Sequence, residues 1–63
     1  MGKKAVILLA IGFEEIEAVT VIDILRRAGI ETIIAGLDGI NITGSHGITI
    51  TADKKLSDLK PDF

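Results

Sequence analysis

The sequence predicts an α/β fold built around a parallel β-sheet. Residues 5–11 form a continuous apolar run, which is typical of a strand that is buried on both faces of such a sheet. Residues 14–29 combine apolar residues at helical spacing with acidic residues at the start and basic residues near the end. A second strand is expected at residues 30–35, so the first half of the chain predicts a right-handed βαβ unit.

The helix is expected over residues 14–29, with Gly29 just past its end. Several of its residues are β-branched, and propensity alone would also allow a strand, but its length and its terminal charges favour a helix. Asp23 is expected to pair with Arg27 one turn later. The apolar stripe is expected to contain Ile16, Val19, Ile22 and either Val21 or Leu25.

The second half of the chain predicts a β-hairpin. Residues 40–43 and 48–51 alternate strictly between apolar and polar side chains, and they flank a glycine-bounded turn at residues 44–47. Strict alternation indicates strands with one polar face, in contrast to the continuous apolar run at residues 5–11.

The last residues predict a short turn and the start of another strand. Asp53 is expected to cap a helical turn that carries Leu56 and Leu59, and Pro61 is expected to end it. Residues 62–63 are interpreted as the beginning of a further strand.

The amino-acid composition excludes several classes of function. With 7 basic and 9 acidic residues and a net charge of -2, the chain has no electrostatic footprint for nucleic acid. It contains no cysteine, so it offers no disulfide, no thiolate metal site and no nucleophilic thiol. The apolar run is too short to cross a bilayer and no signal-peptide cleavage site follows it. We expect a cytoplasmic protein with no cofactor, no metal, and neither nucleic acid nor membrane as partner.

The first strand raises a problem of coverage. Both of its faces are apolar, yet the chain supplies only one long helix and therefore one covering layer. Each large apolar side chain left in water forgoes roughly 1.5 to 3 kcal/mol. We therefore expect residues 1–63 to be the N-terminal part of a single larger α/β domain, with the remainder of the same polypeptide as their partner.

Three glutamates are candidates for chemistry. Glu14, Glu15 and Glu17 follow the first strand, at the edge where open α/β sheets bind ligands. Acidic residues in a first helical turn most often complement the helix dipole in solvent, and this interpretation is favoured for Glu14 and Glu15. Glu17 lies near the edge of the apolar stripe, where a partly buried carboxyl group could hold a proton.

The motifs resemble the opening of the ThiJ/PfpI family. The resemblance covers residues 5–20 and 23–30 and continues at Ser45-His46-Gly47 and Ala52-Asp53. It implies a flavodoxin-like parallel-sheet sandwich related to the class I glutamine amidotransferases, of which this chain would supply only the N-terminal βαβ unit and a β-hairpin. The chain corresponds to about the first third of a family member.

The resemblance also implies roles for particular residues. In the family, the carboxyl group that matches Glu17 hydrogen-bonds a reactive cysteine placed later in the chain, so Glu17 is the candidate catalytic residue. His46 occupies the place of a basic residue that can approach the active site of the partner in a homodimer. His46 and Arg27 are therefore the candidates for substrate or anion binding, although a solvated turn residue and a helix-terminal charge are the simpler interpretations.

The function implied is that of a cysteine-dependent hydrolase or lyase acting on small reactive carbonyl compounds, as glyoxalase or deglycase, or else an amidase or peptidase. The 63 residues alone should be inactive. The alternative is a non-catalytic, chaperone-like or structural homodimer of the same fold.

Two further classes are disfavoured. Glu14, Glu15 and Asp53 superficially match the Mg²⁺ site of a phospho-acceptor receiver domain, but residues 36–47 lack the helical period which that architecture needs. A nucleotide-binding module is weaker still, because Gly12 is not part of a glycine-rich phosphate loop.

Overall fold

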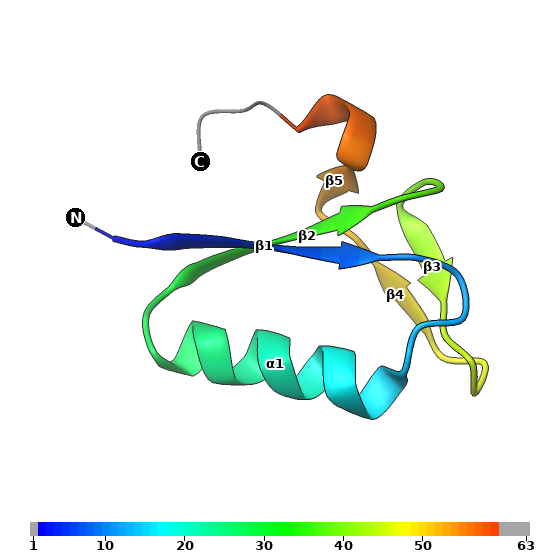
Figure 1. The fold of residues 1–63 in the computed structure, drawn as a ribbon, viewed down its shortest axis with the longest axis horizontal. Helices are drawn as coiled ribbons and strands as arrows, with labels where there is room; N and C mark the ends of the chain where they lie inside the picture. The colour runs from blue at the N-terminus through cyan, green and yellow to red at the C-terminus, as the bar shows by residue number, and fades with distance from the viewer. Residues whose placement is uncertain (1, 60–63) are drawn as a thin grey trace.

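The computed structural model describes residues 2–59, which form a parallel sheet covered on one side by a helix (Figure 1). The sheet has the strand order β1-β2-β5, and β3 pairs with β4 in a separate antiparallel sheet. The elements are β1 (Lys4–Leu9), α1 (Glu15–Arg27), β2 (Glu31–Gly36), β3 (Asn41–Thr43), β4 (Thr49–Thr51), β5 (Lys54–Lys55) and the 3₁₀ helix η1 (Leu56–Asp58). The predicted α/β class, βαβ unit and hairpin are confirmed.

The βαβ unit follows from local signals in the sequence. β1 and β2 run parallel, with Lys4 opposite Glu31 and Leu9 opposite Gly36. The helix ends as predicted, because Gly29 has φ +81° and its N–H donates to the carbonyl of Arg26 at 3.1 Å. None of the helices within residues 2–59 has the length and apolarity that a membrane crossing requires.

The buried face of α1 differs from the predicted stripe. Ile16 is 79% exposed and Val19 is 49% exposed, whereas Ile22 is buried and Ala18 packs against the core. The predicted inward positions of Ile16 and Val19 are therefore wrong. The helix has branched apolar residues on almost every side, so the spacing of apolar residues could not identify the side that meets the sheet.

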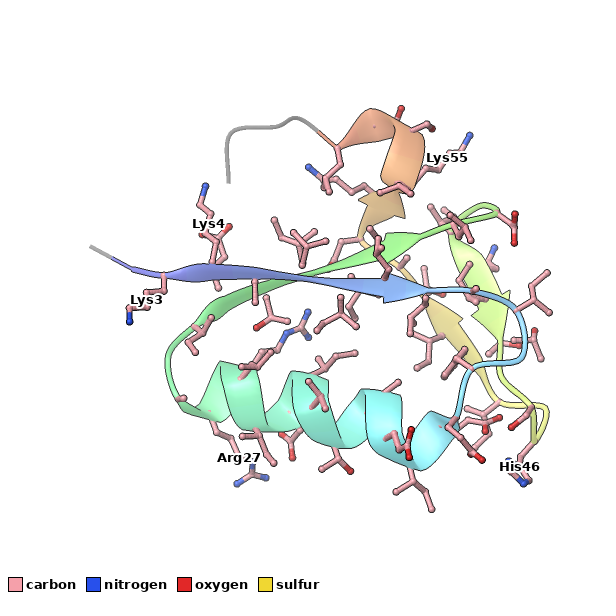
Figure 2. The ribbon with its side chains drawn as sticks, in the orientation of Figure 1. Lys3, Lys4, Arg27, His46 and Lys55 are labelled. Carbon is pink, nitrogen blue, oxygen red and sulfur yellow. The ribbon has the colours of Figure 1, made fainter. Side chains whose placement is uncertain are left out.

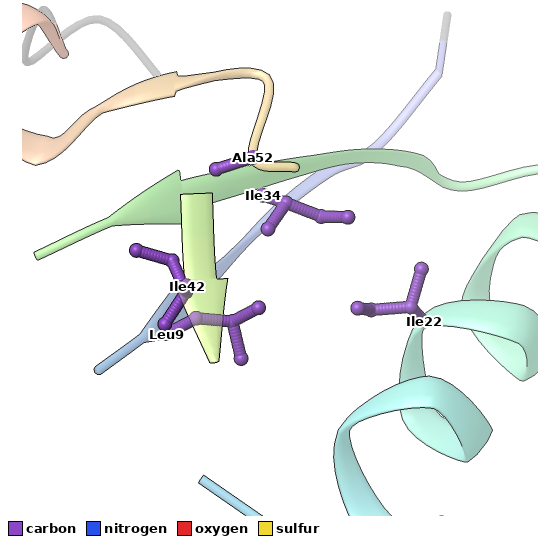
Figure 3. Close-up of a cluster of buried hydrophobic side chains, with 5 residues drawn as sticks. All are labelled: Leu9, Ile22, Ile34, Ile42 and Ala52. Carbon is purple, nitrogen blue, oxygen red and sulfur yellow. The ribbon is translucent and has the colours of Figure 1, made fainter. Parts of the chain in front are cut away.

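The core lies between α1, the sheet and the hairpin (Figure 3). Its buried side chains are Leu9, Ile22, Ile34, Ile42 and Ala52. Side chains alternate along β1, so Leu9 points into this core at 3% exposure while its neighbour Leu8 is 57% exposed on the other face. Within residues 2–59, the predicted burial of the first strand on both faces is therefore not reached at Leu8.

The hairpin is held by its turn and by paired hydroxyl groups. The N–H of Gly47 donates to the carbonyl of Gly44 at 3.1 Å, and the hydroxyl oxygens of Thr43 and Thr49 lie 2.8 Å apart across the strands. Ile42 points the other way and is 1% exposed. One polar face and one buried face are therefore present on β3, as predicted.

Asp53 does not cap a helical turn, which corrects the prediction. Its Oδ2 accepts a hydrogen bond from the N–H of Ile34 at 2.8 Å and lies 3.6 Å from Nη2 of Arg26. The reason is that β5 separates Asp53 from η1, which has no side-chain cap. Asp53 is instead engaged by the backbone of β2. The predictions for Pro61 and residues 62–63 lie outside the described residues.

Candidate functional site

The loop from β1 to α1 is bound to the hairpin turn. The N–H of Gly12 donates to the carbonyl of Thr43 at 2.9 Å, and the N–H of Ser45 donates to the carbonyl of Phe13 at 2.8 Å. Gly12 has φ +90°, a conformation that favours glycine. These contacts bring the first turn of α1 and the side chain of His46 to the same end of the molecule (Figure 2).

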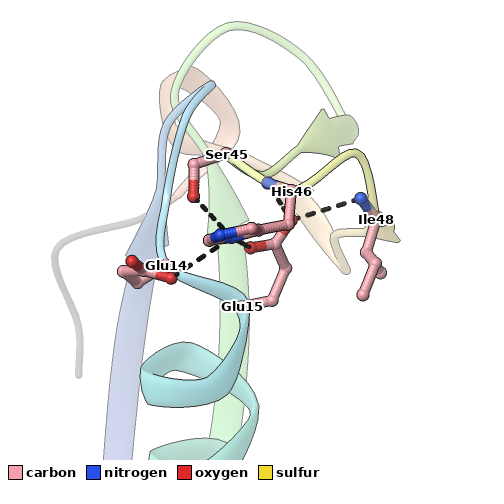
Figure 4. A network of polar contacts seen from close by, with 5 residues as sticks. All are labelled: Glu14, Glu15, Ser45, His46 and Ile48. Carbon is pink, nitrogen blue, oxygen red and sulfur yellow. Dashed lines mark hydrogen bonds and ion pairs between the residues drawn. The ribbon is translucent and has the colours of Figure 1, made fainter.

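Glu15 forms the centre of the polar network at this end (Figure 4). Its Oε2 accepts hydrogen bonds from the backbone N–H of His46 at 2.7 Å and of Ile48 at 3.2 Å, and its Oε1 lies 3.1 Å from Nδ1 of His46. The residue is only 6% exposed. The interpretation of Glu15 as a solvated first-turn acid is therefore wrong.

The environment of Glu15 keeps its carboxyl group ionised. Burial raises the pKa of the group, but hydrogen bonds from the backbone of Glu15, Ile48 and His46 and from the His46 side chain outweigh burial, so the pKa falls from 4.5 to about 2. Gly44 makes room for this carboxylate, because a Cβ at that position would lie 2.5 Å from Oε2 of Glu15. Glu15 is thus a permanently charged acceptor around neutral pH.

His46 is exposed, and within residues 2–59 the polar contacts of its side chain meet at one ring nitrogen. Nδ1 lies 3.1 Å from Oε1 of Glu15, 3.6 Å from Oε1 of Glu14 and 3.0 Å from Oγ of Ser45. A serine-histidine-acid triad needs the serine and the acid on opposite ring nitrogens. These residues therefore do not form a hydrolytic triad.

Glu17 is exposed and lies beside an open, mainly apolar hollow of about 290 Å³. Because Glu17 is exposed, the partial burial expected for it is not found within the described residues. The hollow is lined by Ile7, Leu8, Leu9, Phe13, Glu14, Glu17, Ala18 and Val21. Glu17 is thus placed at the carboxyl end of β1, next to the exposed Leu8.

Arg27 lies in the last turn of α1, at the opposite end of the helix from His46 (Figure 2). Ten residues separate it from Glu17, which corresponds to about 15 Å along the helix. Its Nε donates to Oδ1 of Asp23 at 3.0 Å, the pairing that the sequence predicted. The structure therefore brings Glu17 and His46 to one end of the helix and leaves Arg27 at the other.

Asp53 also lies near the last turn of α1, beside Arg26, and not near Glu14 and Glu15. The three acids of the receiver-type magnesium hypothesis are therefore not brought together. A different set, Glu14, Glu15 and His46, places one possible ligand atom each within 4.8 Å of the others. A cation there would have to compete with the hydrogen bonds that Glu15 already accepts and with the positive end of the helix dipole.

Glu15 was missed although the sequence contains a signal for it. Glu15, Ala18 and Ile22 are spaced by three and four residues, so they share one side of the helix. The structure buries that side. A carboxylate in line with Ala18 and Ile22 indicates a buried acceptor that needs donors from elsewhere in the chain.

Comparison with known proteins agrees with the motifs. The DJ-1/PfpI family model matches residues 3–63. The Parkinson disease protein 7 homologue of Danio rerio is 43% identical over 58 residues, which are 90% of this chain and 31% of the relative. A protein named deglycase from Thermococcus kodakarensis is 34% identical over 59 residues, 94% of this chain and 36% of the relative.

Solved structures show the same backbone. The crystal structure of Drosophila melanogaster DJ-1beta matches with a TM-score of 0.95 and 39% identity, and the match covers 100% of this chain and 34% of that chain. Oxidised DJ-1 of Toxoplasma gondii matches with a TM-score of 0.93 and 38% identity over 98% of this chain and 34% of that chain. The chain thus spans about a third of the length of these proteins. It belongs to the DJ-1/PfpI family.

Proposed function

We propose that residues 1–63 are the N-terminal part of a single α/β domain of a cysteine-dependent enzyme, in which Glu17 is the partner of a cysteine outside this chain. The observation that carries the proposal is the position of Glu17, at the carboxyl end of β1 beside an open apolar hollow. The hollow includes Leu8, which is 57% exposed and would gain a covering layer from the rest of the domain.

Two relatives support a cysteine-dependent carbonyl chemistry. The Thermococcus kodakarensis relative is named a deglycase, and a Salmonella typhimurium relative was solved as a variant with a cysteine replaced by alanine. The proposed location is the cytoplasm, where a reactive thiol is kept reduced.

The proposed substrate is a small reactive aldehyde or its adduct. The thiolate would attack the carbonyl carbon, forming a carbon–sulfur bond while the carbonyl π electrons move to oxygen. Before this attack, the carboxylate of Glu17 would take up the proton of the thiol. The protonated Glu17 would then hydrogen-bond the sulfur and give the proton to the oxygen of the adduct. Amidase or peptidase chemistry uses the same attack with an amide carbonyl, and turnover assays on both substrate classes distinguish the two.

The test is Glu17→Gln in the protein produced from its complete coding sequence. We expect kcat/KM for methylglyoxal to fall by about 10² to 10⁴-fold, because glutamine cannot transfer the proton. Glu31→Gln is the matched control, since Glu31 is an exposed glutamate at the start of β2, and it should leave turnover unchanged.

Turnover by Glu17→Gln within twofold of the unsubstituted protein would remove Glu17 from the mechanism. If the unsubstituted protein turns over neither aldehydes nor amides, the non-catalytic chaperone-like or structural role becomes the better explanation.

We also propose that the protein is a homodimer that buries the outer face of α1. Ile16 and Val19 are 79% and 49% exposed, lie one turn apart and face away from the core. Replacing Val19 with aspartate should weaken the dimer by at least about tenfold in Kd, which sedimentation analysis would measure. Leu37→Asp is the control, because Leu37 is 52% exposed in the loop after β2. An unchanged dimer in Val19→Asp would exclude this face.

A further inference from the structure

Glu15 is a buried, charged group that the proposed chemistry does not use. We propose that Glu15 is a positioning residue for His46, which holds the imidazole with its proton on Nδ1 and leaves Nε2 as the nitrogen that meets a ligand. The inference deepens the proposed function. Its structural part, the tautomer of His46, stands without that function, whereas the expected effect on turnover rests on it.

The first step is the fixed position of the hairpin turn. Oε2 of Glu15 accepts the N–H groups of His46 and Ile48 at 2.7 and 3.2 Å. The N–H of Ser45 donates to the carbonyl of Phe13 at 2.8 Å. The backbone of His46 is therefore attached to the start of α1 and to the loop before it, and these are the same segments that position Glu17.

The second step is the tautomer of the imidazole. An ionised carboxylate only accepts hydrogen bonds, so the 3.1 Å contact between Oε1 of Glu15 and Nδ1 of His46 requires a proton on Nδ1. Oγ of Ser45, at 3.0 Å, can also accept from Nδ1, and Oε1 of Glu14, at 3.6 Å, adds a second negative charge on the same side. With Nδ1 protonated, the neutral ring presents a lone pair at Nε2.

The third step is the surface beside the ring. A hollow of about 260 Å³ is lined by Glu14, Glu15, Ile16, His46 and Ile48. Glu14 lines both this hollow and the one beside Glu17. Two isoleucine side chains beside the accepting Nε2 and the carboxylate of Glu14 fit a small substrate that donates hydroxyl groups and carries a short apolar part. The hydroxyl-bearing adduct that the proposed attack forms from a small aldehyde has this chemistry.

The structural test is the tautomer itself, measured by the nitrogen-15 chemical shifts of the neutral His46 ring. We expect the Nδ1–H form in the unsubstituted protein. In Glu15→Gln, the amide oxygen can still accept from the turn while its NH₂ group donates to Nδ1, so the ring should switch to the Nε2–H form. Glu14→Gln is the control and should not switch the ring, because its contact is longer.

An Nε2–H tautomer in the unsubstituted protein would overturn the proposal, whatever the variants do. An unchanged ring in Glu15→Gln, with the backbone amide shifts of residues 44–48 preserved, would overturn it as well. If Glu15→Gln changes the backbone amide shifts of residues 44–48, the tautomer measured in the unsubstituted protein alone decides whether the proposal holds.

The turnover test separates positioning from a general structural role. Glu15→Gln should lower kcat/KM for methylglyoxal by about tenfold, the size expected for one lost hydrogen bond. In a His46→Ala background, the same substitution should cause no further loss. A full additional loss in that background would show that Glu15 acts independently of His46. Absence of turnover in the unsubstituted protein would refute the proposed function and leave the tautomer measurement to decide this inference.

Discussion

Replacing Gly36 with alanine is expected to destabilise the fold more than any other single methyl addition considered. A Cβ at Gly36 would lie 1.7 Å from the carbonyl oxygen of Gly39 and 2.9 Å from Cδ1 of Ile42. The first contact is with backbone, so it cannot be relieved by rotating a side chain. Overpacking usually costs about 1–3 kcal/mol, and we expect Gly36→Ala to reach or exceed the upper end of that range in urea unfolding of the complete protein.

Gly2→Ala is the matched control, because a Cβ at Gly2 meets no atom within 4 Å. Both substitutions add the same methyl group and remove the same glycine freedom. Equal unfolding free energies for the two variants would mean that residues 37–39 do not fold back over the end of β2 as the structure places them.

The sequence predicts those parts of the fold that depend on residues close together in the chain. The apolar run of β1, the glycine after α1 and the alternation around residues 44–47 are all local patterns, and each led to an element close to the expected bounds. β5 has only two residues, which is too short to leave a pattern. The inward side of α1 depends on contacts with distant strands, so the spacing of apolar residues could not select it.

The candidate site likewise has one residue, Glu17, that the sequence predicted and one, Glu15, whose environment it did not. The resemblance to a family pointed to Glu17, and the structure places that residue at the expected end of β1. The environment of Glu15 could not be predicted from its neighbours, because its donors come from His46 and Ile48, 31 and 33 residues further along the chain. The alignment of Glu15 with Ala18 and Ile22 indicates burial, but it does not indicate which groups donate to the carboxylate.

Asp53 illustrates how the same local signal leads to an error. An aspartate shortly before a helical turn is a common cap, and the sequence gives no reason to reject that interpretation. In the structure its carboxylate accepts the N–H of Ile34, and its own N–H donates to the carbonyl of Ile34 at 2.8 Å. The residue thus joins β2 to the segment that leads into β5, which is a contact between distant parts of the chain.

Truncating Ile42 to alanine is expected to cost about 2–5 kcal/mol of unfolding free energy, the range for large-to-small changes in a packed core. Ile42 is 1% exposed and belongs to the cluster that includes Leu9 and Ile34. β3 has only three residues, so this side chain is the main apolar anchor of its strand. Urea unfolding monitored by circular dichroism would measure the loss.

Ile40→Ala provides the comparison, because Ile40 is two residues earlier and 41% exposed. The chemical change is identical, but solvent already contacts Ile40, so less packing is lost and the remaining cavity is open to water. We expect Ile40→Ala to lose less than half as much stability as Ile42→Ala. A larger loss at Ile40 would contradict the structure, in which Ile42 and not Ile40 is the fully buried isoleucine on this side of the strand.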